Sequence, residues 1–148
     1  MAYTTIDDPS AYFKVQLYTG TGAEHAVTFN DTDTDMQPDL VWLKNRTDAA
    51  TNHCLTDSVR GATVCLFSNL THANTTEAQA LKSFDSDGFT LGTDTSVNTS
   101  SKNWVSWSWK ADTSGSGTTT GSGTGTTYNY TVNTTAGFSI IKYGGNGT

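Results

Sequence analysis

The stretch of sequence that decides the fold is QPDLVWLKNR at Gln37–Arg46, followed closely by DSVRG at Asp57–Gly61. Pro38 fixes the entry to a continuous apolar run, Leu40–Leu43, and such a run predicts a central strand covered on both faces. The first stretch ends in an Asn-Arg corner, and the second reads as a tight turn between two strands. Both stretches predict a β-rich core, and neither contains a residue pattern that is typical of a reaction centre.

Further strands are predicted on both sides of this segment. In Ala11–Tyr18, apolar side chains alternate with polar ones, which is the period-2 pattern of a half-buried strand. The other predicted strands are His25–Phe29, His53–Leu55, Thr63–Phe67, Phe89–Leu91 and Asn103–Lys110. Ser68–Lys82 is ambiguous and accommodates one helical turn over Glu77–Leu81, capped by Thr75 or Thr76. Because Thr, Gly, Asn and Asp are abundant and good helix formers are scarce, the sequence predicts an all-β antiparallel sandwich.

The last predicted strand of the sandwich is rich in tryptophan. Trp107 and Trp109 share a face with Val105, so this face is predicted to fill the core. Trp104 points to the other side, where it would bury in a subunit contact or stack on a sugar. A subunit contact is the favoured interpretation.

Charge and the lack of long apolar runs argue against two kinds of contact, nucleic-acid binding and membrane insertion. The net charge is −6 and the pI is about 4.7. An acidic surface repels phosphate backbones, and no stripe of Lys and Arg offsets it, which argues against nucleic-acid binding. No apolar run reaches the roughly 18 residues needed for membrane insertion. Met1–Asp8 lacks the basic and apolar regions of a signal peptide, so we expect synthesis in a cytoplasm and no standard secretion route.

Cys54 and Cys65 are the two cysteines, and their spacing is neither that of a zinc site nor that of a redox motif. They flank the turn at Asp57–Gly61, where they could face each other across a hairpin. Two small buried side chains are the favoured prediction, and a disulfide is the alternative.

The chain is predicted to divide into four parts. Residues 1–10 form an N-terminal arm, and residues 11–111 form the sandwich. Residues 112–127 are almost only Ser, Gly and Thr, which predicts a flexible linker. Residues 128–148 repeat the pattern of an alternating strand that ends at Tyr and a Gly-rich turn. They predict the start of a second similar unit, either truncated, continued in a longer polypeptide, or paired with a neighbouring chain.

Residues suited to catalysis or metal binding are sparse. Glu24 and Glu77 are the only glutamates, and they fall in a loop and in the ambiguous segment rather than facing each other across a groove. No nucleophile lies beside an obvious base, so we expect a protein that is not an enzyme. Asp31, Asp33 and Asp35 imitate half of a calcium loop but lack its Gly and Glu, which favours a solvated acidic turn. A looser calcium site is the alternative, and no other cofactor is expected.

Four charged residues border the two opening stretches: Lys44, Arg46, Asp57 and Arg60. An Arg fork satisfies carbonyls or grips a carboxylate, so these residues are predicted to pin the hairpin and the corner. A shallow polar site for a sugar is the alternative.

Taken together, several motifs resemble a domain that recurs in structural and fibre proteins of tailed phages, many of them marine. The motifs are Tyr18–Gly20, Pro38–Arg46, Asp57–Gly61, Ser83–Phe89 and Trp104–Trp107. The chain departs from the pattern in the acidic insert Asp31–Asp35 and at Trp104, where Tyr is expected. The resemblance implies a jelly-roll sandwich similar to concanavalin and SPRY folds.

The same resemblance implies a non-enzymatic virion component, assembled in the host cytoplasm and displayed on the particle exterior. The expected partners are further copies of the chain, with a trimer as the first expectation, and other virion proteins. Possible oligomer or sugar contacts are Trp104, Tyr128, Tyr130 and Tyr143. The alternative function is a carbohydrate-binding module that recognises a host-surface glycan.

Overall fold

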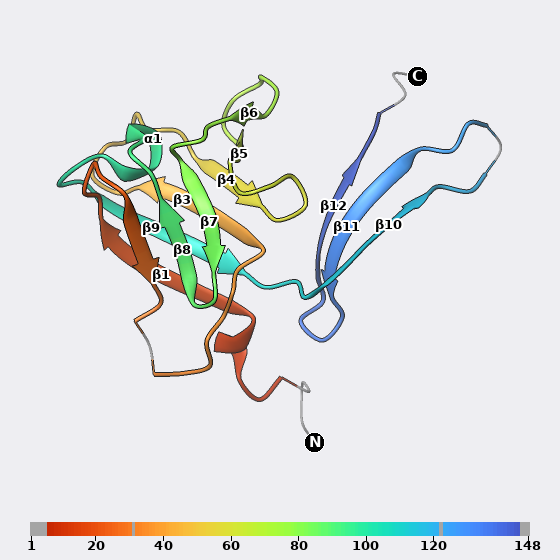
Figure 1. Cartoon of the computed structure of the whole chain (residues 1–148), viewed down its shortest axis with the longest axis horizontal. Helices are drawn as coiled ribbons and strands as arrows, with labels where there is room; N and C mark the ends of the chain where they lie inside the picture. The colour runs from red at the N-terminus through yellow and green to blue at the C-terminus, as the bar shows by residue number, and fades with distance from the viewer. Residues whose placement is uncertain (1–5, 31, 122, 146–148) are drawn as a thin grey trace.

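The computed structural model describes residues 6–30, 32–121 and 123–145, and antiparallel strands in three sheets dominate it (Figure 1). The elements are η1 (Pro9–Ala11), β1 (Phe13–Thr19), β2 (His25–Thr28), β3 (Leu40–Asn45), β4 (Cys54–Asp57), β5 (Val64–Phe67), β6 (Thr75–Thr76), β7 (Leu81–Asp85), β8 (Gly88–Leu91), α1 (Thr95–Asn98), β9 (Asn103–Trp109), β10 (Thr113–Thr118), β11 (Thr127–Asn133) and β12 (Phe138–Tyr143). The sheet orders are β1-β9-β3-β4-β5-β6, β2-β8-β7 and β10-β11-β12.

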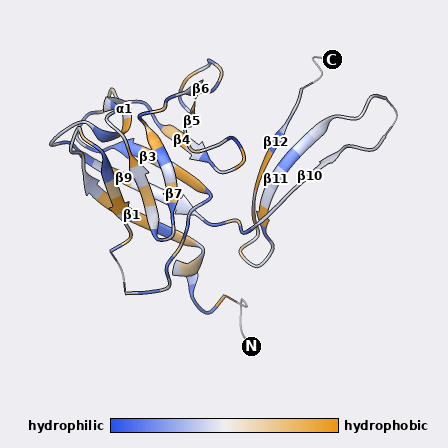
Figure 2. Cartoon of the chain, viewed as in Figure 1, coloured by the Kyte–Doolittle hydropathy of each residue, from blue (hydrophilic) through white to orange (hydrophobic). Residues whose placement is uncertain are grey.

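The first two sheets form the predicted sandwich. In Figure 1, β7 and β8 lie over β3 and β9, and Figure 2 shows hydrophobic residues in β3 and in several other strands of both sheets. One buried cluster takes side chains from both sheets, including Val41 and Leu43 from the large sheet and Val27 and Phe89 from the small one. Burial of this apolar surface is the main stabilising contribution to such a fold. The all-β antiparallel prediction is confirmed.

Trp104 lies in the centre of this core and is fully buried. Its ring stacks on that of Tyr18 from the neighbouring strand, with centroids 6.2 Å apart and an interplanar angle of 11°. Tyr18 also meets Phe89 of the small sheet edge-on at 6.3 Å, and its hydroxyl donates to the carbonyl of Val97 at 2.8 Å. Burial raises the pKa of Tyr18 well above its ordinary value.

The predicted faces of β9 are therefore reversed. Trp104, Ser106 and Ser108 point into the sandwich, whereas Trp107 and Trp109 lie half-buried on the outer side of the large sheet. Trp104 is thus not available for a subunit or sugar contact. Alternation identifies which side chains share a face but not which face is inside, and here the face with more apolar residues is the outer one.

The two strands beside β9 follow the same orientation. In β1, Lys14 and Tyr18 are buried, while Phe13, Val15 and Leu17 are exposed by 39%, 51% and 55%. In β3, the inward side chains are buried and the outward ones are only half-buried. The prediction that Leu40–Leu43 is covered on both faces is wrong, because no other layer of the described residues covers the outer side of this strand.

The turn at Asp57–Gly61 joins β4 to β5, as predicted. Cys54 and Cys65 form a disulfide across this hairpin, so the favoured expectation of two free cysteines is wrong. Both side chains point inward from two paired strands, and they lie close enough for a disulfide to form. In place of the predicted helical turn over Glu77–Leu81 there is one hydrogen-bonded turn, in which the N–H of Ala80 donates to the carbonyl of Glu77 at 2.9 Å. β7 begins at Leu81, and the four-residue helix α1 forms further on.

The predicted linker contains a strand. β10 pairs along its whole length with β11, which pairs in turn with β12. The glycines of β10 make this pairing possible, because Tyr130 and Tyr128 of β11 lie across Gly115 and Gly117. A Cβ at Gly115 would stand 2.5 Å from the Tyr130 hydroxyl, and one at Gly117 would stand 2.6 Å from that of Tyr128. The Ser-Gly alternation is thus half of a cross-strand pattern rather than a sign of flexibility.

The difference in burial between Trp104, inside the core, and Trp107, on the outer side, leads to the first prediction. Trp104→Ala should lower the free energy of unfolding by about 3–5 kcal/mol, because it opens a cavity in the centre of the core. Trp107→Ala should cost less than about 2 kcal/mol, since its side chain keeps access to solvent. Urea denaturation of both variants measures the difference. Equal losses, or a larger loss for Trp107→Ala, would contradict the orientation of β9.

The third sheet leads to the second prediction. Amide protons of Gly115 and Gly117 should exchange with deuterium more slowly than those of Gly121 and Gly123, because the first pair lies in a hydrogen-bonded strand. Gly115→Val should abolish this difference by displacing the Tyr130 ring. Hydrogen exchange followed by NMR or mass spectrometry provides the measurement. Equally fast exchange of all four amides in the unsubstituted protein would restore the flexible-linker prediction.

Candidate interaction surface

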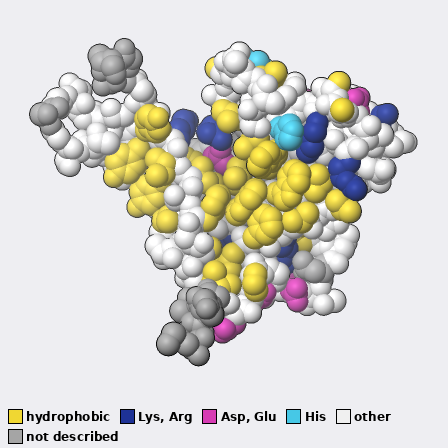
Figure 3. All heavy atoms as spheres, turned by 180° about the vertical axis from the view of Figure 1, so that it is seen from behind, with side chains coloured by type: hydrophobic (Ala, Val, Ile, Leu, Met, Phe, Trp, Pro, Cys, Tyr) yellow, Lys and Arg dark blue, Asp and Glu magenta, His cyan; other side chains and the backbone are white. Residues whose placement is uncertain are grey.

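The outer side of the six-stranded sheet is an apolar surface open to solvent, here called the outer face. Its central row crosses five paired strands in direct register: Val15, Trp107, Trp42, Leu55 and Leu66. Seen from behind, this part of the molecule forms a broad continuous area of hydrophobic side chains (Figure 3). Such rows arise because cross-strand neighbours in register lie about 5 Å apart on the same side of a sheet.

Two flanking rows extend the outer face. One consists of Phe13, Trp109 and Leu40, and the other of Leu17, Val105, which is exposed by only 7%, and the charged Lys44. Large contiguous apolar areas are rare on proteins that work alone, and they mark sites of contact. The outer face is therefore the strongest candidate site among the described residues.

The aromatic rings of the outer face are packed at an angle to one another. Trp42 and Trp107 lie 5.5 Å apart at 57°, and Phe13 and Trp109 lie 4.9 Å apart at 49°. Their edges and faces alternate, so they present a ridged surface. A ridged apolar surface suits a protein partner that interdigitates better than it suits a flat ligand.

His53 lies at the rim of the outer face and supports Trp42. The indole Nε1–H of Trp42 donates to His53 Nδ1 at 3.0 Å, so this nitrogen is unprotonated. Burial and then the positive charge of Lys44 lower the pKa of His53 below its ordinary 6.5. Lys44 itself donates to the carbonyl of Thr51 at 2.5 Å. These contacts keep His53 neutral and hold the Trp42 ring in place.

An apolar hollow of about 480 Å³ adjoins the outer face where the third sheet meets the sandwich. Phe13 and Trp109 line it on one side and Phe138 on the other, with Ile6 and Tyr12 from the N-terminal segment. The ring of Phe138 stacks on that of Trp109 at 6.0 Å and 20°. The third sheet is thus joined to the edge of the outer face by an aromatic contact.

The four charged residues predicted to pin the turn and corner do not form one cluster. Asp57 is buried, accepts the backbone N–H groups of Val59 and Arg60 at 3.0 and 2.9 Å, and forms an ion pair with the Arg60 guanidinium. Lys44 and Arg46 lie at the opposite end of β3. The turn is therefore pinned as predicted, but a sugar site made from all four residues does not form.

Sequence reasoning missed Asp39, which joins three parts of the structure. Its carboxylate accepts the hydroxyl of Ser58 at 2.6 Å and the backbone N–H of Ala111 at 2.8 Å. Its own N–H donates to the carbonyl of Trp109 at 2.7 Å. The residue lies in the Pro-Asp pair before β3, a usual place for a turn-forming aspartate, and nothing in the sequence indicates its distant partners.

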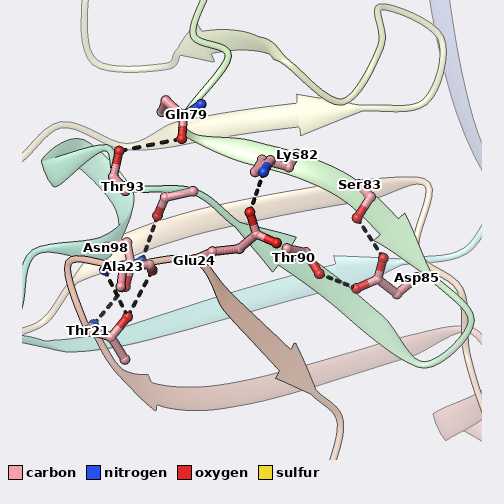
Figure 4. A network of polar contacts seen from close by, with 11 residues as sticks. Thr21, Ala23, Glu24, Gln79, Lys82, Ser83, Asp85, Thr90, Thr93 and Asn98 are labelled. Atoms are coloured by element: carbon pink, nitrogen blue, oxygen red, sulfur yellow. Dashed lines mark hydrogen bonds and ion pairs between the residues drawn. The ribbon is translucent and has the colours of Figure 1, made fainter.

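Asn98 is a second structural centre that the sequence did not reveal. Its amide donates to the carbonyls of Ala23 and Gly92, both at 2.7 Å, and its side-chain oxygen accepts the N–H of Thr21 at 2.8 Å (Figure 4). The residue is fully buried, and these bonds satisfy it. Its role is to tie the helix α1 to the β1–β2 loop.

The tyrosines predicted as oligomer or sugar contacts lie together on one side of the third sheet. Tyr128 stands opposite Tyr143 in the β11–β12 register, and the rings of Tyr128 and Tyr130 are 6.1 Å apart. Tyr143 is exposed by 70%. Trp104, grouped with them by the sequence, lies in the core of the sandwich instead.

The predicted calcium loop is only partly visible. Asp31 lies outside the described residues, and Asp33 and Asp35 are exposed. Within residues 6–30, 32–121 and 123–145, no three His, Cys, Asp or Glu side chains are placed to hold a metal ion. In the same part of the chain, neither helical element has the length and apolarity required to cross a bilayer.

The contact between Trp42 and His53 leads to a prediction about pH. In the unfolded chain His53 takes up a proton near pH 6.5, but in the folded protein it does so only at lower pH. The unfolded state therefore binds more protons as the pH falls below 6.5, and the free energy of unfolding decreases. His53→Gln should reduce the loss of melting temperature between pH 7.5 and 5.5, whereas His72→Gln should not. An unchanged loss in His53→Gln would contradict the assignment.

Comparison with known proteins places the chain in a family. No curated protein matches the sequence. Nor does any solved structure. Residues 8–148, nearly the whole chain, match the family described as "Domain of unknown function (DUF7483)". The sandwich, the outer face and the third sheet all fall within the matched residues, so the protein belongs to the DUF7483 family.

Proposed function

We propose that this protein is a non-enzymatic structural component of a tailed-phage virion, a fibre or surface appendage that acts by assembling with further copies of itself. The observation that carries the proposal is the outer face, where apolar side chains of five paired strands are open to water. Removal of apolar surface from water is a main driving force of association between protein chains. A protein that worked as a monomer would leave this surface uncovered.

The size of the outer face supports assembly. Five strands about 4.8 Å apart and three rows about 7 Å apart give a footprint on the order of 20 by 20 Å, or about 400 Å². Apolar patches of a few hundred Å² are often functional surfaces, and a stable contact between copies would also include residues around the outer face to reach the roughly 800 Å² per partner of a standard interface. The resemblance to phage fibre proteins makes a trimer the expected closed unit, and other virion proteins are the expected neighbours.

The disulfide supports display on the particle exterior. Cys54 and Cys65 are joined within the core of the sandwich, and such bonds persist in oxidising surroundings rather than in a cytoplasm. The protein would assemble in the host cytoplasm, and its disulfide would persist once the released particle is in oxidising surroundings. The net charge of −6 also favours solubility of an external protein.

The carboxylates described in the structure support a role without catalysis. Asp39 and Asp57 are occupied in turns, and Asp85 accepts the hydroxyls of Ser83 and Thr90, both at 2.7 Å (Figure 4). Glu24 forms an ion pair with Lys82 on the surface. These groups have the contacts of structural residues, and none of them lines the apolar hollow beside the outer face.

The alternative function is recognition of a host-surface glycan by the same outer face. Half-buried Trp42, Trp107 and Trp109 are the side chains that stack on sugar rings. Their tilted arrangement would select a bent rather than a flat saccharide. Binding of a glycan by a protein that stays monomeric, with loss of binding in Trp107→Ala, would favour this alternative.

The proposed function predicts a specific response of the solution mass. Val15→Lys combined with Leu17→Lys places two charges on the outer face at exposed positions, so the fold should persist while assembly is lost. Thr28→Lys, an exposed change on the outer side of the small sheet, is the matched control. Light scattering should give a multiple of 15.8 kDa for the unsubstituted protein and the control, and a strongly reduced mass for the double variant.

If the unsubstituted protein remains a monomer at all accessible concentrations, the proposal is contradicted. A double variant that folds normally and keeps the full assembled mass would also contradict it. In either case the outer face would not join copies of the chain.

A further inference from the structure

The third sheet carries a second open apolar surface, here called the tyrosine face. Its rows are Gly115, Tyr130 and Ile141, and Gly117, Tyr128 and Tyr143. Ile141 is exposed by 58% and Tyr143 by 70%, the largest values among the exposed hydrophobic side chains described. Exposed apolar side chains that lie together on a surface mark sites of contact. This surface therefore calls for a partner.

The opposite side of the third sheet already has contacts. Phe138 lies on that side and stacks on Trp109 of the sandwich. Thr131 and Asn133 are buried there, and Asn133 donates to the carboxylate of Asp112 at 2.5 Å. The tyrosine face is thus the side of the sheet left open within the described chain.

The tyrosine face has the shape of a step. On the β10 side, the rings of Tyr130 and Tyr128 lie down over Gly115 and Gly117, so the surface there is low. On the β12 side, Ile141 and Tyr143 stand exposed, so the surface is high. When a step of this kind is turned by 180° and placed on itself, the high side meets the low side. Such a surface is complementary to its own copy.

The charge distribution also favours contact between the tyrosine faces of two copies of the chain. All 14 acidic side chains of the sequence occur at or before Asp112. After Asp112 the only charged side chain is Lys142, and the strand alternation places it on the opposite side from Tyr143. Two copies can therefore bring their tyrosine faces together without placing like charges in the contact, while the acidic sandwiches remain apart.

We propose that the tyrosine face binds the tyrosine face of a second copy through a two-fold contact. This inference rests on the proposed function and extends it, because each chain then has two separate surfaces for contact with other copies. A single self-contact with two-fold or three-fold symmetry ends in a closed unit. Two different ones connect such units to each other, and the array grows.

The size of the tyrosine face determines how the two surfaces cooperate. Three strands of about six residues give a footprint of about 14 by 20 Å, well below the roughly 800 Å² per partner of a standard interface. The contact should therefore be weak between isolated chains. It becomes durable once the outer face has gathered several chains, because several tyrosine faces then act together at high effective concentration.

Sedimentation velocity over a range of concentrations tests the proposal. The unsubstituted protein should exceed the closed unit set by the outer face, and its mass should rise with concentration. Ile141→Asn combined with Tyr143→Ser should stop at that closed unit. Lys142→Ser, on the same strand but the opposite side, should behave like the unsubstituted protein. Circular dichroism checks that the variants keep their strands.

The outcomes separate this inference from the proposed function. If Ile141→Asn with Tyr143→Ser matches the unsubstituted protein while Val15→Lys with Leu17→Lys dissociates it, the tyrosine face is not a contact and the proposed function stands. If the unsubstituted protein is monomeric throughout, the proposed function itself fails, and the inference fails with it.

A cross-linking experiment tests the tyrosine face without relying on the mass. Tyr143→Cys, treated with a short bis-maleimide under non-reducing conditions, should give a covalent dimer at high protein concentration. Lys142→Cys should give at least tenfold less, because its thiol projects from the other side of the strand. Equal yields from the two variants would show random collision and overturn the two-fold contact.

Discussion

The orientation of β9 is the constraint on which the rest of the structure depends. Trp104 is fully buried and stacks on Tyr18, so its strand has only one possible rotation. Because successive side chains alternate, burial of Trp104 places Trp107 and Trp109 on the outer side. β1 and β3 pair directly with β9, and their registers transfer the same orientation to Val15 and Trp42. One core tryptophan thus determines both the filling of the sandwich and the composition of its outer face.

A small number of contacts joins the third sheet to the sandwich. β9 leads directly into β10, and Asp39 fixes this passage by accepting the N–H of Ala111. Phe138 then stacks on Trp109, a member of the outer face. The two surfaces proposed to bind other copies are therefore held in one chain by short, specific contacts. Such coupling is what an array needs, because a loosely tethered second surface would lose most of its effective concentration.

The sequence predicted the class of fold and several turns for reasons that operate locally. Turn residues and strand alternation depend on neighbouring positions, so the hairpin at Asp57–Gly61 and the strand at Phe89–Leu91 were found. The face of β9 depends instead on which side another sheet covers, and no local pattern contains that information. Ser106 and Ser108 made the inner side look like the solvent side, although both are fully buried.

The third sheet shows a second kind of limit. Read alone, the Ser-Gly-rich stretch has the composition of a linker. Its strand forms only because Tyr128 and Tyr130, more than ten residues later, lie over the glycines. The sequence analysis grouped Tyr128, Tyr130 and Tyr143 as contact residues, but it added Trp104, which is buried in the core. Asp39 and Asn98 escaped notice because their partners come from distant parts of the chain.

The central claim is that copies of this protein cover one another's outer face. Hydroxyl-radical footprinting of the intact protein, at concentrations where it is dilute and where it is assembled, tests this directly at single residues. Oxidation of Leu17 and Trp107 should fall several-fold on concentration, while oxidation of Leu70, exposed outside both proposed surfaces, should stay constant. If the mass increases but Leu17 and Trp107 remain as reactive as in the dilute protein, another surface joins the copies and the account is wrong.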